Sequence, residues 1–112
     1  MKKKIITILV TGVLLILSQT YAHATVTCCE KITNVTVHSN GQIYFQTDQT
    51  CSANWCQLNW GYDAKLLDRG YAVILTAKTT GSTVAIEWPA IPNCTSQNQV
   101  YASPGFVQLL TP

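Results

Sequence analysis

Charged side chains are scarce in this sequence, since Asp, Glu, Lys and Arg together make up 11% of its 112 residues. Three of the seven basic residues stand at the extreme amino terminus, so the rest of the chain carries four basic against five acidic side chains. These are Lys31, Lys65, Arg69 and Lys78, and Glu30, Asp48, Asp63, Asp68 and Glu87. Such a chain has no basic patch to neutralise phosphate groups, which excludes nucleic acid as an expected partner.

Side chains suited to catalysis are also few. Beyond residue 24 the chain holds a single histidine, His38, which we expect to be a solvated residue beside a turn. Asp63 and Asp68 stand five positions apart in a predicted helix, so they do not share a helix face. The sequence contains no phosphate-binding glycine motif. We therefore predict that the protein is not an enzyme and uses neither a cofactor nor a metal ion.

The sequence has no apolar run long enough to cross a lipid bilayer. The run from Ile5 to Leu17 has about thirteen residues, whereas a membrane-spanning helix needs roughly 20. Lys2–Lys4 precede this run and Ala22-His23-Ala24 follows it, an order that is typical of a secretory signal peptide. We expect residues 1–24 to be removed, the protein to be periplasmic or secreted, and residues 25–112 to form a single disulfide-stabilised domain.

Five cysteines lie in the predicted domain: Cys28, Cys29, Cys51, Cys56 and Cys94. In a small exported chain, cysteines are expected to form disulfides that stabilise a modest core. Their spacing is not that of paired zinc ligands. Adjacent cysteines rarely bridge each other, so we expect Cys51 to pair with Cys94, and Cys56 with either Cys28 or Cys29. The fifth thiol would then either join two subunits or be buried.

Alternating apolar and polar residues predict the strands. The first two form a hairpin from Ile32 to Thr47 around Asn40-Gly41, because both turn residues tolerate a positive φ. A third strand is expected from Trp55 to Trp60, with its Cys56 side facing the interior. A fourth strand and one or two closing strands are expected over Ser82–Trp88, Val100–Ala102 and Phe106–Leu110.

One helix is predicted from Asp63 to Thr80, because apolar residues recur there at spacings of three and four. Asp63 suits the N-cap and Gly81 the position just after the helix. Gly70 in mid-helix costs up to about 1 kcal/mol, which indicates a close approach of the helix to the sheet. The predicted fold class is α+β, mainly β: a small OB-fold-like barrel of five to six strands, with one helix between strands 3 and 4.

Aromatic residues are numerous for so small a domain and include Trp55, Trp60, Trp88, Tyr44, Tyr62, Tyr71 and Tyr101. The phases of the predicted elements place Trp60, Tyr71 and Trp88 in the core. Trp55 and Tyr44 instead fall on the polar faces of their strands. Aromatic rings can stack on the apolar faces of sugars, and Asn and Gln can bind hydroxyl groups. Trp55 and Tyr44 are therefore the candidate glycan-contact residues.

Two stretches resemble small exported bacterial proteins of the pertussis-like toxin B-subunit type, which include the B subunits of subtilase cytotoxin and typhoid toxin. One is Ile32–Phe45, which contains Gly41-Gln42-Ile43. The other is Leu66-Leu67 leading into Leu75–Ile86, a helix that ends in Thr-Gly before a strand. The resemblance implies an OB-fold, a homo-pentameric ring, binding of sialylated glycans on a host cell, and a secreted enzymatic subunit as partner.

The chain departs from that family at the receptor site. Toxin members carry a receptor-contacting serine just before the first strand, where this chain has Cys28 or Cys29. They also have a longer aromatic stretch through the helix, so no binding residue is carried over from the family. A second hypothesis of another class is a monomeric periplasmic or surface protein that binds a protein partner or acts as an inhibitor.

Overall fold

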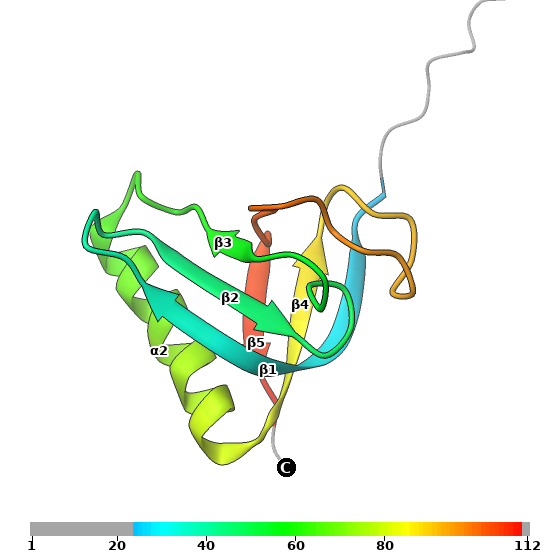
Figure 1. The fold of residues 1–112 in the computed structure, drawn as a ribbon, viewed down its shortest axis with the longest axis horizontal. Coiled ribbons are helices and arrows are strands. Elements are labelled where there is room, and N and C mark those ends of the chain that lie inside the picture. Colours follow the sequence, from blue (N-terminus) through cyan, green and yellow to red (C-terminus); the bar gives the residue numbers. More distant parts are fainter. Residues whose placement is uncertain (1–23, 111–112) are drawn as a thin grey trace, which may run out of the picture.

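The computed structural model describes residues 24–110, so the predicted signal peptide, apart from Ala24, lies outside the described residues. Within this range the chain forms a small, mainly β domain of five strands and one helix (Figure 1). The elements are β1 (Val26–Val37), β2 (Ile43–Thr47), β3 (Cys56–Leu58), α2 (Ala64–Thr80), β4 (Thr83–Trp88) and β5 (Phe106–Leu109). Among these residues no helix has the length and apolar character needed to cross a membrane.

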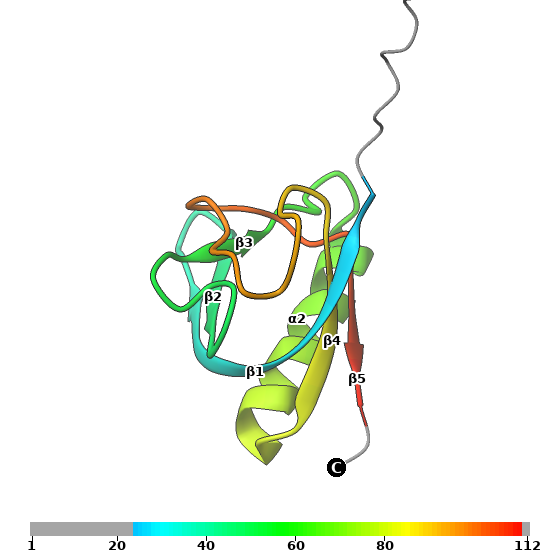
Figure 2. The same ribbon diagram turned by 90° about the vertical axis from the view of Figure 1, so that its right-hand side faces the viewer.

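The five strands form one antiparallel sheet in the order β3-β2-β1-β4-β5. The first half of β1 pairs with β4, with Cys28 opposite Ile86, and its second half pairs with β2, with Val35 opposite Phe45. The β1–β2 register shifts between Ile32 and Asn34. Such an irregularity bends a strand, and Figures 1 and 2 show β1 curving from one half of the sheet into the other.

The core lies between the concave side of this sheet and α2, which contacts β1, β3, β4 and β5 (Figure 2). Phe45 and Trp88 are fully buried, and their stacked ring centroids lie 6.2 Å apart. This confirms the predicted core position of Trp88, while Trp60 and Tyr71 are partly buried against the core. The other buried apolar residues include Ile32, Ile43, Leu58, Ile74, Ala77, Val84, Ile86 and Ile91.

The predicted helix is confirmed together with both of its ends. The Asp63 carboxylate accepts hydrogen bonds from the amides of Lys65 and Leu66 at 3.0 and 3.2 Å. These bonds satisfy two of the amides that a helix start leaves without a partner. At the other end Gly81 adopts a left-handed φ of 70°, and its amide caps the carbonyl of Ala77. The helix therefore begins and ends where its own residues dictate.

The predicted α+β, mainly β class with one helix between strands 3 and 4 is confirmed, but the sheet is open and does not close into the predicted barrel. β3 and β5 form no ladder; instead the Gln57 amide on β3 donates to the carbonyl of Ala102 at 2.9 Å. The predicted strand over Val100–Ala102 is a turn, in which Tyr101 has a left-handed φ of 64°. Pro104 follows and has no amide to donate. A left-handed residue and a proline interrupt the extended backbone that a closing ladder needs.

Gly70 is required by a close contact, as predicted, but the contact is with a side chain. A Cβ added at Gly70 would lie 2.5 Å from Cζ3 of Trp60 and 3.3 Å from Cδ1 of Leu58. The Trp60 ring cannot easily move away, because its Nε1 donates a hydrogen bond to the carbonyl of Pro104 at 3.0 Å. The glycine therefore allows α2 to approach the residues that surround the end of β3.

We expect Gly70→Ala to lower the free energy of unfolding by about 1–2 kcal/mol. Overpacking costs about 1–3 kcal/mol, and a Cβ only 2.5 Å from Cζ3 of Trp60 places this contact in the upper part of that range, above the gain in helix propensity of about 1 kcal/mol. Urea denaturation of the oxidised protein measures the change. Gly61→Ala is the matched control, since a Cβ added there meets nothing within 4 Å. Equal stability of wild type and Gly70→Ala would contradict the close contact.

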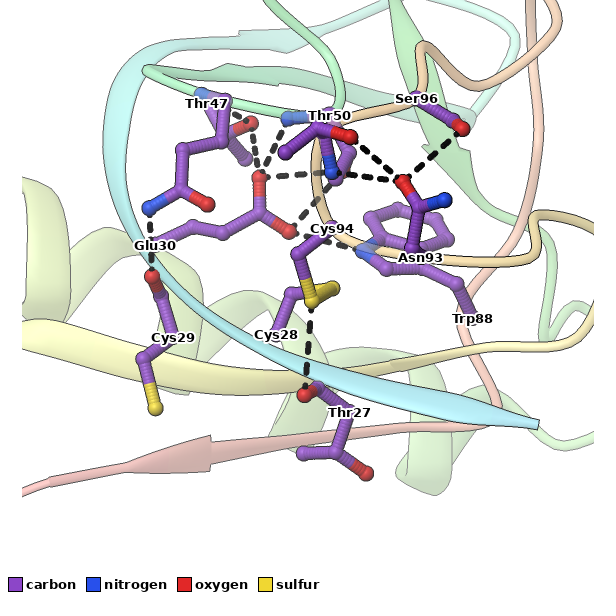
Figure 3. The surroundings of a disulfide bond; sticks show 12 residues. Thr27, Cys28, Cys29, Glu30, Thr47, Thr50, Trp88, Asn93, Cys94 and Ser96 are labelled. Carbon is purple, nitrogen blue, oxygen red and sulfur yellow. Dashed lines mark hydrogen bonds between the residues drawn. A yellow bond between two sulfur atoms is a disulfide. The ribbon is translucent and has the colours of Figure 1, made fainter.

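The predicted disulfide pairing is wrong. Cys28 bridges Cys94, and Cys51 bridges Cys56. Cys29 is free and exposed rather than buried. The cause is strand alternation, since Cys28 points into the core whereas Figure 3 shows the Cys29 sulfur directed away from the Cys28–Cys94 bond.

Peptide mapping of the oxidised protein tests this pairing. We expect a Cys28–Cys94 cross-link, a Cys51–Cys56 cross-link, and alkylation of Cys29 without prior reduction. The variant Cys29→Ser should keep both cross-links, because the free thiol belongs to neither. A peptide that joins Cys51 to Cys94 would contradict the structure.

Candidate functional site

A cavity of about 350 Å³ opens on the outer face of the β1–β2–β3 half of the sheet. It is lined by Thr36, His38, Tyr44, Trp55 and Tyr101. Tyr44 and Trp55, the two contact residues predicted from the sequence, therefore lie in one cavity, and both are partly buried. Three of the five lining side chains are aromatic, so the wall offers flat apolar surfaces beside polar groups.

Strand alternation places two of these side chains next to each other. Thr36 on β1 lies opposite Tyr44 on β2, and Tyr44 in turn lies opposite Gln57 on β3. The neighbours Val35 and Phe45 point to the other side of the sheet and pack in the core. Thr36, Tyr44 and Gln57 therefore form a row across the outer face of the three strands, with Tyr44 in the middle.

Trp55 and Tyr101 reach the cavity from segments outside the strands. The amide of Tyr101 donates a hydrogen bond to the carbonyl of Trp55 at 2.6 Å, which joins the two backbones directly. Tyr101 is the one described residue other than glycine with a positive φ. Such a conformation costs a bulky residue on the order of 1–3 kcal/mol, and strained residues of this kind cluster at ligand sites.

The Tyr101 ring packs beside Tyr44, with the ring centroids 5.2 Å apart and the planes tilted by 48°. His38 meets the same Tyr44 ring from another direction, edge to face at 6.5 Å. The Tyr44 hydroxyl is held by the side-chain oxygen of Gln42. Tyr44 is therefore held from several sides by Tyr101, His38 and Gln42.

The Cys51–Cys56 disulfide supports the tryptophan of the site. It closes a short loop with a sequence separation of 5 between β2 and β3, and Trp55 is the last residue before its second cysteine. The side-chain amide of Asn54 in the same loop donates to the carbonyl of Asn98 at 3.0 Å. A loop held by a disulfide and by a neighbouring segment loses little conformational entropy when a ligand binds.

The Cys28–Cys94 disulfide supports the tyrosine of the site. It ties the long segment between β4 and β5, which carries Tyr101, to the first half of β1 (Figure 3). Further along this segment, the Asn98 amide donates to the carbonyl of Thr50 at 2.7 Å. Each disulfide therefore holds one of the two non-strand segments that supply the cavity with an aromatic ring.

Beneath these segments lies a buried carboxylate that sequence reasoning missed. Glu30 is 1% exposed. Its Oε1 accepts hydrogen bonds from the Thr47 hydroxyl at 2.6 Å and the Thr50 amide at 2.8 Å, and its Oε2 accepts one from Trp88 Nε1 at 2.8 Å (Figure 3). All of these donors are neutral. The cluster joins β1, β2, β4 and the loop that leads to Trp55, so it is a structural centre under the site.

A second cavity, of about 260 Å³, lies between α2 and the start of β5. Its lining includes Trp60, Tyr62, Leu66, Arg69, Val73 and Phe106. Most of these side chains are apolar, and Tyr62 at its rim is 81% exposed. This cavity shares no residue with the first one.

Comparisons with protein-family models, with curated proteins and with solved structures found no match for this chain. The resemblance to toxin B subunits therefore stays a prediction.

Proposed function

We propose that this protein is an exported, non-catalytic binding module that holds a carbohydrate in the cavity formed by Tyr44, Trp55 and Tyr101. The observation that carries the proposal is this cavity, in which aromatic rings from β2 and from two disulfide-anchored segments meet. Its volume of about 350 Å³ lies within the range of small-molecule sites, roughly 300–1,000 Å³.

The chemistry of the wall supports a sugar as the ligand. A pyranose ring has a flat C–H surface, which packs well on aromatic rings, and a rim of hydroxyl groups that need hydrogen-bond partners. Polar groups flank the rings, among them the Thr36 hydroxyl, the His38 imidazole and the Gln57 amide beside Tyr44. The hydroxyl and the amide can both donate to and accept from the hydroxyl groups of a sugar.

The location of the cavity supports the same ligand class. The strand order and the helix between β3 and β4 resemble those of an OB-type fold, although the sheet is open between β3 and β5. OB-folds bind oligosaccharides and oligonucleotides on the face of strands 2 and 3, between the loops that join strands 1–2 and 4–5. Tyr44 lies on β2, His38 precedes the β1–β2 loop, and Tyr101 lies between β4 and β5. The scarcity of basic residues favours sugar over nucleic acid.

The test is a screen of the oxidised mature protein against immobilised oligosaccharides. We expect binding that is retained in the oxidised protein and lost after reduction, because both aromatic segments are held by disulfides. An absence of binding to any glycan, or binding that reduction leaves unchanged, would contradict the proposal.

The toxin-like part of the proposal adds a ring of five subunits and a secreted enzymatic partner. Size-exclusion chromatography with light scattering measures the subunit number of the mature protein. A mass of five subunits supports delivery of a partner by a B-subunit-like ring. A monomer would contradict the ring and favour the second hypothesis, in which an exported protein binds a partner in the cell envelope through an apolar cavity such as the one beside Tyr62.

A further inference from the structure

The wall of the candidate sugar site carries no permanent charge among the residues that line it. Of the four basic side chains in residues 24–110, three lie on α2, which contributes nothing to this cavity. The fourth, Lys31, donates from its Nζ to the carbonyl of Gly81 at 2.8 Å, at the carboxyl end of α2. No carboxylate lines the cavity either. The cavity is therefore lined by no Asp, Glu, Lys or Arg side chain.

His38 is the single nitrogen base in the lining. Its Nδ1 accepts a hydrogen bond from the backbone amide of Asn40 at 3.3 Å, so Nε2 is the ring nitrogen left to contact a ligand. The titratable group that faces the imidazole is the phenol of Tyr44, and no cation or carboxylate accompanies it in the lining. His38 therefore offers a ligand one ring nitrogen, in a lining that contains neither Lys nor Arg.

An acidic sugar fits such a wall poorly. A carboxylate that loses part of its hydration when it packs against aromatic rings needs a cation or several charge-assisted donors in return. Neutral hydroxyls need only the kind of partners that line this cavity, such as the Thr36 hydroxyl and the His38 imidazole. Aromatic stacking depends on the C–H face of the ring and is available to neutral sugars in full.

We propose that the cavity selects uncharged hexopyranoses and discriminates against sugars that carry a carboxylate, including the sialylated glycans implied by the toxin resemblance. This inference rests on the proposed carbohydrate function and names the ligand class of that same site. Selectivity arises from the absence of Lys and Arg around Tyr44, Trp55 and Tyr101 in the described chain. The aromatic rings supply affinity, and the uncharged wall supplies the discrimination.

The experiment compares matched pairs by isothermal titration calorimetry: lactose with 3′-sialyllactose, methyl glucoside with methyl glucuronide, and N-acetylglucosamine with N-acetylmuramic acid. We expect the neutral member of any pair that binds to do so at least tenfold more tightly. Equal or tighter binding of the acidic members, if it is lost in Trp55→Ala, would overturn the inference and leave the sugar site standing. No binding of any member, or binding that Trp55→Ala leaves unchanged, would overturn both.

A charge added to the wall tests the cause directly. Thr36 lies on the outer face of β1 opposite Tyr44, where a longer side chain meets solvent. We expect Thr36→Lys to raise the affinity for the acidic sugar relative to its neutral partner at least fivefold, with an effect that weakens in high salt. Thr36→Gln is the control for side-chain length without charge. The same acidic-to-neutral affinity ratio in both variants would contradict charge as the basis of selectivity.

Discussion

Trp55→Ala should weaken carbohydrate binding by at least thirtyfold. Removal of an aromatic anchor from the centre of a binding site costs about 2 kcal/mol or more, and each 1.4 kcal/mol corresponds to a factor of about ten. The backbone of the site should survive the change, because Tyr101 is held by the carbonyl of Trp55 rather than by its indole ring. The loss should therefore appear in affinity and not in stability.

A titration by isothermal calorimetry measures this effect. Tyr62→Ala is the matched control: it removes an aromatic ring that is 81% exposed and lines the other cavity. We expect Tyr62→Ala to bind the sugar as wild type does. A Trp55→Ala variant within threefold of wild-type affinity, or a comparable loss in Tyr62→Ala, would show that the cavity at Tyr44 is not the binding site.

Glu30→Gln should lower the free energy of unfolding by about 2–4 kcal/mol. The carboxylate accepts from Thr47, Thr50 and Trp88 and has no donor of its own to place among them. An amide at this position turns one acceptor into a donor, so at least one buried N–H or O–H loses its partner. Such a group costs about 1–3 kcal/mol, and the loss of charge weakens the remaining hydrogen bonds.

Chemical denaturation with both disulfides intact measures this loss. Glu87→Gln is the matched control, because Glu87 is only partly buried and accepts a bond from the exposed Thr25 hydroxyl at 3.2 Å. We expect the control to change stability by less than about 1 kcal/mol. If the two variants proved equally stable, the buried cluster would not be the structural centre under the site.

Some residues of the candidate site could be predicted from the local sequence pattern, and others could not. Tyr44 and Trp55 were predictable because period-two alternation places Tyr44 on the outer face of β2 and Trp55 on the outer side of the predicted third strand, although β3 itself begins only at Cys56. Thr36 was within reach of the same argument, as the cross-strand partner of Tyr44 in the predicted hairpin. Tyr101 was not, since its place depends on a left-handed backbone in a turn where the sequence predicts a strand. His38 lies exposed beside the turn, as expected, yet it also lines the cavity.

The burial of Glu30 could not be predicted from the local sequence pattern. The residues of β1 that face the core are Cys28, Glu30 and Ile32. Because a charged residue is not expected among buried positions, the alternation of buried and exposed residues is hard to recognise there. The predicted hairpin therefore began at Ile32, whereas β1 begins at Val26. The neighbouring sequence does not indicate that Glu30 is buried. Its hydrogen-bond partners Thr47, Thr50 and Trp88 stand 17, 20 and 58 positions further along the chain.

The sequence by itself determined the elements whose causes are local. These are the helix between Asp63 and Gly81 with both caps, the turn at Asn40-Gly41, and the faces of β2 and β3. Each depends on residues within a few positions of one another, which propensity and periodicity describe. Only the tertiary structure decided the disulfide partners, the open edge between β3 and β5, the burial of Glu30 and the meeting of Trp55 with Tyr101. These depend on distances between segments far apart in the chain, and residue spacing carries no information about such distances.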